Sequence, residues 1–107
     1  MISSVKMAKN NSETKLQSDC ITWCKQNGFL AYNQHQGGFT GKGVPDILMC
    51  IHGRFVAVEL KVGKGRRSPS QEIRKIQIER AGGIHITPYS FDEFTEAIRR
   101  LYDDLPH

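Results

Sequence analysis

Three ionisable residues around a short turn could do chemistry together. His52-Gly53 is a turn signal, and the runs on either side of it are mainly apolar, which predicts a hairpin with a two-residue turn. In that register Asp46 lies opposite Glu59, and directly opposed residues share a face of the sheet. Lys61 is two positions beyond Glu59 and points to the same face. The sequence therefore predicts that these three side chains meet at the open end of one hairpin.

A fold tolerates two directly opposed carboxylates only if something offsets their repulsion, because like charges opposite each other destabilise a sheet. A cation between them would supply one, and carboxylate and carbonyl oxygens suit Mg²⁺ or Mn²⁺. A lysine beside such an ion can orient or deprotonate a bound water, or offset negative charge in the transition state. These groups could hydrolyse a phosphodiester. The alternative is an ion pair of Lys61 with Glu59 or Asp46 at a solvated strand end.

The elements that must position these residues follow from periodicity and capping signals. Ser68 and Ser90 each begin a capping box, and Cys20, Trp23 and Cys24 form an apolar stripe that is expected in the core. The predicted elements are a helix over 12–27, strands over 29–33, 45–51 and 54–61, a helix over 68–81, a strand over 84–87 and a helix over 90–102. This α-β-β-β-α-β-α order predicts an α/β fold with a small mixed β-sheet flanked by helices.

Length and composition indicate one globular domain. The chain has 107 residues, of which 38% are hydrophobic and 24% charged. We predict a flexible arm over 1–11, which is polar, and a single domain over 12–107. No apolar run is long enough for a membrane span or a signal peptide, and the three cysteines, an odd number, favour a reducing compartment. An intracellular protein without membrane association is therefore expected.

The hairpin residues also resemble a known family. Gly43-Val44-Pro45-Asp46, followed after twelve residues by Glu59-Leu60-Lys61, resembles the core motif of the PD-(D/E)XK nucleases. The fuller pattern is similar to the virus-type replication-repair nuclease (VRR-Nuc) branch. It adds Glu13 in the first helix, a glycine-containing loop over 34–43 and Gln71 at the start of the next helix. The resemblance covers residues 12–87 and implies a restriction-endonuclease-like core in a small, stand-alone form.

The resemblance implies a divalent-metal-dependent DNA endonuclease. Asp46, Glu59 and the backbone carbonyl of Leu60 would bind Mg²⁺ or Mn²⁺, and Glu13 would complete the acidic site as a further candidate ligand. Lys61 would act on the attacking water. Small stand-alone members of the family resemble Holliday junction resolvases. The resemblance thus also implies a homodimer that acts on branched DNA, such as four-way junctions, and needs no organic cofactor.

Two of the implied site residues have a structural alternative. Gln71 would hold water, metal or phosphate, but Ser68-x-x-Gln71 is also a capping box. Asn10-x-x-Glu13 has the same pattern, so Glu13 could serve only to begin a helix.

Basic residues border the same end of the hairpin. They could neutralise phosphates on both sides of a scissile bond, although any one of them could be solvated surface charge. These candidates are Lys42, Lys64, Arg66, Arg67, Arg74 and Lys75. The net charge of +4 is a small excess that does not by itself establish nucleic-acid binding. A second hypothesis is a non-catalytic nucleic-acid-binding module on the same fold, which is disfavoured because every core catalytic position is filled.

Overall fold

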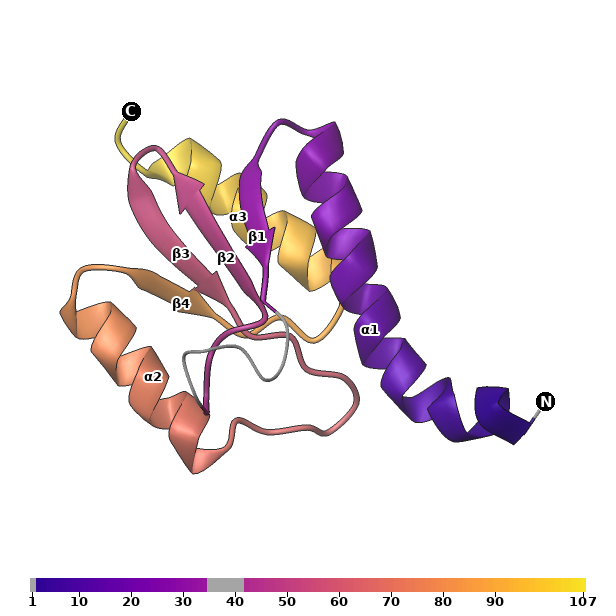
Figure 1. Cartoon of the computed structure of the whole chain (residues 1–107). Helices are drawn as coiled ribbons and strands as arrows, with labels where there is room; N and C mark the ends of the chain where they lie inside the picture. The colour runs from indigo at the N-terminus through magenta and orange to yellow at the C-terminus, as the bar shows by residue number, and fades with distance from the viewer. Residues whose placement is uncertain (1, 35–41) are drawn as a thin grey trace.

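The computed structural model describes residues 2–34 and 42–107, with side chains from residue 12 onward. Figure 1 shows the elements in the predicted order: α1 (Ile2–Gln26), β1 (Leu30–Asn33), β2 (Ile47–Ile51), β3 (Arg54–Val58), α2 (Pro69–Arg80), β4 (Ile84–Ile86) and α3 (Phe91–Asp104). The strands form one sheet in the order β1-β2-β3-β4. All neighbours are antiparallel except β3 and β4, which are parallel. The predicted α/β fold with a small mixed sheet is confirmed.

The β2–β3 hairpin has the register that a two-residue turn predicts. Ile51 pairs with Arg54, and the ladder continues to Ile47 and Val58. Both turn residues have a positive φ, 50° at His52 and 80° at Gly53, as tight hairpin turns of this kind require. The open end of the hairpin therefore lies at Asp46 and Glu59, which are the next residues beyond the last ladder pair, Ile47 and Val58.

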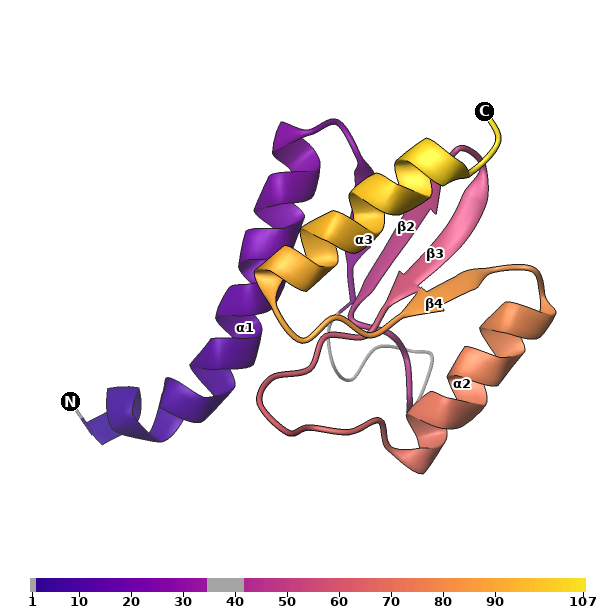
Figure 2. The ribbon, with the colours of Figure 1, turned by 180° about the vertical axis from the view of Figure 1, so that it is seen from behind.

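One face of the sheet packs on α1 and α3 and forms the core. In Figure 1 α3 crosses behind the strands and α1 runs beside β1, and Figure 2, seen from the opposite side, shows α3 in front of the strands. Phe94 and Ile98 of α3 are fully buried, as are the predicted core residues Cys20 and Cys24 of α1, and Trp23 stacks on Phe29 at 5.5 Å. Burial raises the pKa of Cys20 to about 12 and that of Cys24 to about 11, so both thiols stay protonated.

The other face of the sheet is only partly covered. The register places Leu30, Tyr32 and Phe55 on this face together with His85. His85 is buried, with only 8% of its surface exposed, while the other three side chains are exposed. Figure 1 shows that α2 lies beside β4 and that, among the described elements, no helix lies in front of β1 and β2. With respect to residues 2–34 and 42–107, the sheet thus presents an uncovered apolar surface on β1, β2 and the nearer part of β3.

The first helix begins earlier than predicted. Helix α1 starts at Ile2 rather than Ser12, so the predicted arm over 1–11 has helical backbone from Ile2 onward. No proline or glycine interrupts residues 2–26, and nothing in this segment therefore stops the helix. Most of the predicted loop over 34–43 lies outside the described residues. Within the described residues, no helix combines the length and the apolar character needed to cross a membrane.

Candidate active site

The hairpin ends at Asp46 because a side chain replaces a backbone partner there. In the β2–β3 register Pro45 would stand opposite Leu60, and a proline has no N–H to give to the ladder. The backbone N–H of Leu60 instead donates to Asp46 Oδ2 at 2.7 Å. This bond holds the Asp46 carboxylate against the start of the segment that carries Glu59 and Lys61. The predicted strands over 45–51 and 54–61 are shorter in the structure for this reason.

Glu59 is a buried carboxylate, with only 2% of its surface exposed. Its Oε2 accepts a hydrogen bond from Gln71 Nε2 at 2.7 Å, and Lys61 Nζ lies 3.9 Å from the same oxygen. Its Oε1 is also buried, and no described residue donates a hydrogen bond to it. Burial, and then the charge of Asp46, raises the pKa of Glu59 to about 8. The ion pair of Lys61 with Glu59 that was the alternative is therefore present, but it is buried and does not lie at a solvated strand end.

Asp46 and Glu13 add negative charge beside Glu59. Burial raises the pKa of Asp46, against the opposing effect of the Leu60 N–H. The charge of Glu13 raises the pKa of both Asp46 and Glu59, which means that this half-buried side chain of α1 lies close to the hairpin end. The structure thus brings Glu13 near the hairpin end, but within the described residues the three acidic side chains do not gather closely enough to hold one ion.

Lys61 and Gln71 form the other half of the site. Lys61 Nζ donates to Gln71 Oε1 at 3.0 Å. The same oxygen accepts from the backbone N–H of Ser68 at 2.8 Å, and Ser68 Oγ accepts from the Gln71 N–H, which completes a capping box at the start of α2. The two interpretations of Gln71 are therefore compatible. Its capping contacts fix its position, and its amide group bridges Lys61 and Glu59.

Helix α1 supplies Glu13 from its interior, not from its start. Asn10 lies within the helix, so Asn10 and Glu13 cannot form an N-terminal capping box. One turn further on, Gln17 Nε2 donates to the backbone carbonyl of Asp46 at 3.1 Å and also contacts Asn33 Oδ1. Gln17 was missed from the sequence, although its spacing of four residues from Glu13 places the two on one helix face. It fixes α1 against the hairpin end.

Gly43 sets the distance between the hairpin and α2. It has a φ of 79°, and a Cβ at this position would lie 2.4 Å from the backbone oxygen of Ser70 and 3.0 Å from the backbone nitrogen of Gln71. Only glycine allows so close an approach together with this backbone conformation. The backbone carbonyl of the neighbouring Lys42 accepts a hydrogen bond from Arg74 Nε at 3.3 Å. The glycine-containing segment thus docks directly on the helix that positions Gln71.

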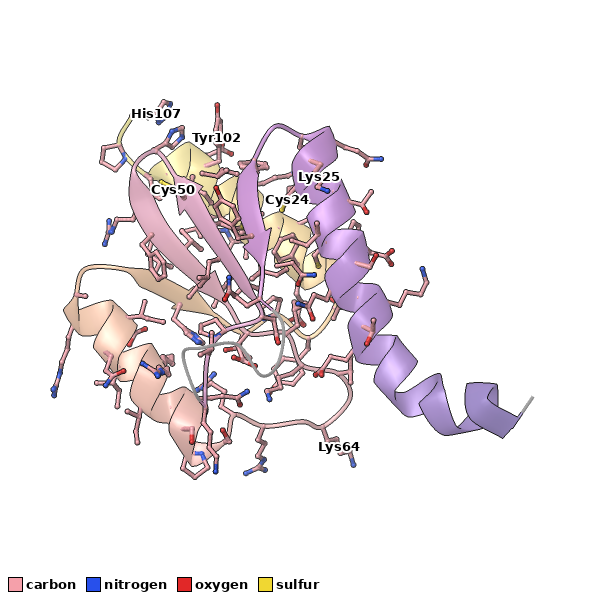
Figure 3. All side chains as sticks on the ribbon, in the orientation of Figure 1. Cys24, Lys25, Cys50, Lys64, Tyr102 and His107 are labelled. Atoms are coloured by element: carbon pink, nitrogen blue, oxygen red, sulfur yellow. The ribbon has the colours of Figure 1, made fainter. Side chains whose placement is uncertain are left out.

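The predicted basic residues fall into two groups. Arg67 bonds to Glu72 at 3.0 Å and to Thr87 at 2.8 Å, and Lys75 pairs with Glu79 at 3.2 Å. These side chains and Arg74 have structural contacts within the chain. A second group has exposed side chains, and Figure 3 shows one of them, Lys64, projecting from the loop after β3. This exposed group consists of Lys42, Lys64 and Arg66.

The donor atoms fit a hard divalent cation. The Asp46 and Glu59 carboxylates supply oxygen ligands, and the unpartnered, buried Glu59 Oε1 is an acceptor that a cation would satisfy. Within residues 2–34 and 42–107, no three His, Cys, Asp or Glu side chains gather closely enough to hold one ion. A set of two carboxylates is usual for Mg²⁺, which keeps several of its waters.

A comparison with solved structures identifies the fold that carries this site. A solved structure described as a VRR_NUC domain superposes on the chain with a TM-score of 0.70 at 22% sequence identity. The match covers 84% of this chain and 97% of that chain. The chain has the VRR_NUC domain fold. No protein-family model and no curated protein matches the sequence.

The VRR_NUC likeness spans nearly the whole of the matched structure, so the fold around the hairpin is complete in this chain. The recognition from Asp46, Glu59 and Lys61 is thereby confirmed at the level of the fold. The VRR_NUC domain fold is established, and the roles of the individual side chains are proposals from their geometry.

Proposed function

We propose that the chain is a divalent-metal-dependent DNA endonuclease that hydrolyses phosphodiester bonds. The observation that carries this proposal is the half-buried Asp46 carboxylate beside the buried Glu59, with one Glu59 oxygen unpartnered among the described residues and a lysine beside it. A fold maintains such a costly arrangement when a function needs it, and a bound cation would relieve the cost. The nuclease fold supports the same conclusion.

Each side chain has a task that its contacts support. Asp46 and Glu59 would hold Mg²⁺ or Mn²⁺ together with the Leu60 carbonyl, and such an ion supplies Lewis-acid polarisation of the phosphate and an activated water. Lys61 places a positive charge where the phosphate gains negative charge in the transition state. Gln71 is a positioning residue, because it touches both Lys61 and Glu59 and is itself fixed at the start of α2.

The preferred substrate in this proposal is branched DNA, such as a four-way junction, cut by a homodimer. One site cuts one strand, so two copies related by a twofold axis could cut two strands symmetrically. The uncovered apolar face of the sheet, with Leu30, Tyr32 and Phe55, offers a surface on which a second copy could pack.

The decisive experiment measures cleavage of labelled four-way junction, flap, duplex and single-stranded DNA in Mn²⁺, in Mg²⁺ and in EDTA. We expect metal-dependent cleavage, with the junction preferred, and a loss of about 100-fold or more in Lys61→Ala and Asp46→Ala. DNA binding by Lys61→Ala should persist. Thermal melting of each variant checks that it is folded. If all four substrates are cleaved at equal rates, the proposed nuclease activity stands but the proposed preference for four-way junctions is wrong.

The alternative is a non-catalytic nucleic-acid-binding module. It predicts salt-sensitive binding, no cleavage in any metal and little change in Lys61→Ala. The buried Glu59 carboxylate favours the nuclease, because phosphate binding alone gains nothing from a second negative charge beside Asp46.

A further inference from the structure

A polar cleft runs from the candidate active site along α1. It has a volume of about 640 Å³, within the range of ligand-binding clefts. Seven of its ten lining residues belong to the segment of α1 from Glu13 to Lys25, and the others are Asn33, Gln34 and Asp46. Because Asp46 and Glu13 line the cleft, it is continuous with the acidic centre.

The helical wall of the cleft carries hydroxyl groups in a row. Thr14, Ser18 and Thr22 recur every four residues, so they lie one above the other on one helix face, and all three are exposed. Among the described residues none of them has a hydrogen-bond partner. Lys25 follows three residues later and makes no ion pair within the described part of the chain. Hydroxyls and a lysine are typical contacts of phosphates and sugars in nucleic-acid complexes.

The opposite wall and the floor are amide groups. Asn33 and Gln34 line the side next to β1. Gln17 closes the floor, where its amide nitrogen donates to the backbone carbonyls of Asp46 at 3.1 Å and Gln34 at 3.4 Å. Among the described residues, no carboxylate other than those of Glu13 and Asp46 lines the cleft. Its far end is therefore neutral or positive, which suits a polyanion that leaves the acidic centre.

The length of the cleft suits a strand of several nucleotides. Twelve residues separate Glu13 from Lys25, which is about 18 Å along the helix axis at 1.5 Å per residue. Figure 3 shows Lys25 near the end of α1, far from the exposed Lys64 on the loop after β3.

We propose that this cleft binds one strand of nucleic acid as it leaves the cut site, through Thr14, Ser18, Thr22 and Lys25. The proposal rests on the proposed nuclease function. It adds a second binding surface on the opposite side of the acidic centre from the basic residues of α2 and its preceding loop. The strand would pass from Lys64 and Arg66, across Asp46 and Glu59, to Lys25.

The test measures binding of a labelled single-stranded oligonucleotide in EDTA, across a range of salt concentrations. Lys25→Gln should weaken binding and reduce the slope of log K against log salt by about 0.7, the value for one phosphate contact on a single strand. The triple variant T14A/S18A/T22A should weaken binding without changing this slope. Lys15→Gln is the matched control, because Lys15 lies on the same helix, does not line the cleft and pairs with Asp19.

Binding in EDTA separates the two proposals. If wild type cleaves DNA but Lys25→Gln and the triple variant bind like Lys15→Gln, the cleft proposal is overturned and the nuclease stands. If binding depends on the cleft residues and no cleavage occurs in any metal, the nuclease proposal fails, while the binding of a nucleic-acid strand by the cleft stands. Lys25 also lies in the last turn of α1, where its charge favours the helix. A melting curve of each variant shows whether a binding defect reflects unfolding.

Discussion

Glu59 combines three conditions that destabilise a carboxylate: burial, a neighbouring carboxylate and an oxygen with no donor among the described residues. Each of these disfavours the ionised form, and Lys61, at 3.9 Å, compensates only in part. At the residue scale, Glu59 therefore lowers the stability of the folded protein when no metal is bound. Its chemistry and its contribution to stability can be separated by a single change of side chain.

Glu59→Gln should make the metal-free protein more stable at pH 7, by about 1–3 kcal/mol, because Glu59 must take up a proton or bury a charge when the chain folds, whereas glutamine is neutral. Thermal melting in EDTA measures this gain. Wild type should also gain stability when Mg²⁺ or Mn²⁺ is added, and the variant should not. Glu72→Gln, at an exposed pair with Arg67, is the control and should respond to the metal like wild type. A variant that melts below wild type in EDTA would contradict the prediction.

His85 is the second buried ionisable residue without a partner among those described. Burial, and then the charges of Arg67 and Lys75, lowers its pKa below the ordinary value of 6.5, with a partial opposing effect of Glu79 and Glu72. The unfolded chain therefore takes up a proton first as the pH falls. Stability is fully present above pH 6.5 and is lost as the pH drops toward the folded pKa.

His85→Leu should remove this part of the pH dependence. We expect wild type to lose up to about 1.4 kcal/mol per pH unit from this group over that window, and the variant to lose less. Urea unfolding at several pH values between 7 and about 5 measures the difference. If the free energy of unfolding depends on pH in the same way for both proteins, the protonation of His85 does not change when the chain unfolds, and the prediction is wrong.

At the scale of elements, the sequence predicts what local signals determine. The turn at His52-Gly53 determines the register, and the register brings Asp46 and Glu59 together. The capping box determines where α2 begins and hence where Gln71 lies. The predicted start of α1 at Ser12 was wrong, because residues 2–11 contain no proline or glycine that would keep the helix from beginning earlier. The cleft beside α1 could not be predicted at all, since it depends on how that helix packs against β1 and Asp46.

Gly43→Ala tests the contact between the hairpin and α2. The added Cβ would meet backbone atoms of Ser70, so the start of α2 must shift and carry Gln71 with it. We expect a loss of about 2–4 kcal/mol in stability and a large loss of cleavage. Gly53→Ala is the matched control, because Gly53 has nearly the same φ of 80° but nothing within 4 Å of its Cβ position. It should lose only about 1–2 kcal/mol, the cost of the left-handed backbone. Urea unfolding measures both losses. Equal losses of stability in the two variants would show that the close approach of Gly43 to Ser70 does not contribute.

At the scale of the whole molecule, the two faces of the sheet are treated differently. One face is covered by α1 and α3, and the other leaves three large apolar side chains exposed on β1 and β3. A strand at the edge of a sheet, as β1 is, also has unpaired backbone groups. This combination supports the proposed contact between two copies.

Tyr32→Glu should separate the proposed homodimer into monomers, because it places a charge in the middle of the apolar face. Light scattering during size-exclusion chromatography measures the mass directly. Phe91→Glu is the control, since this exposed side chain lies at the start of α3, on the other side of the sheet, where an acidic residue favours the helix. A wild type that is monomeric at all concentrations would refute the dimer without affecting the cleavage chemistry.

The two-residue turn between β2 and β3 also bears on the order in which the chain folds. A hairpin is a local contact that forms within about 1–10 microseconds, whereas contacts that close long loops form later. We therefore expect Asp46 and Glu59 to meet before α1 brings Glu13 and α2 brings Gln71. Their repulsion then acts on the folding rate as well as on the finished structure. Divalent ions would speed the earliest step of folding, long before any substrate arrives.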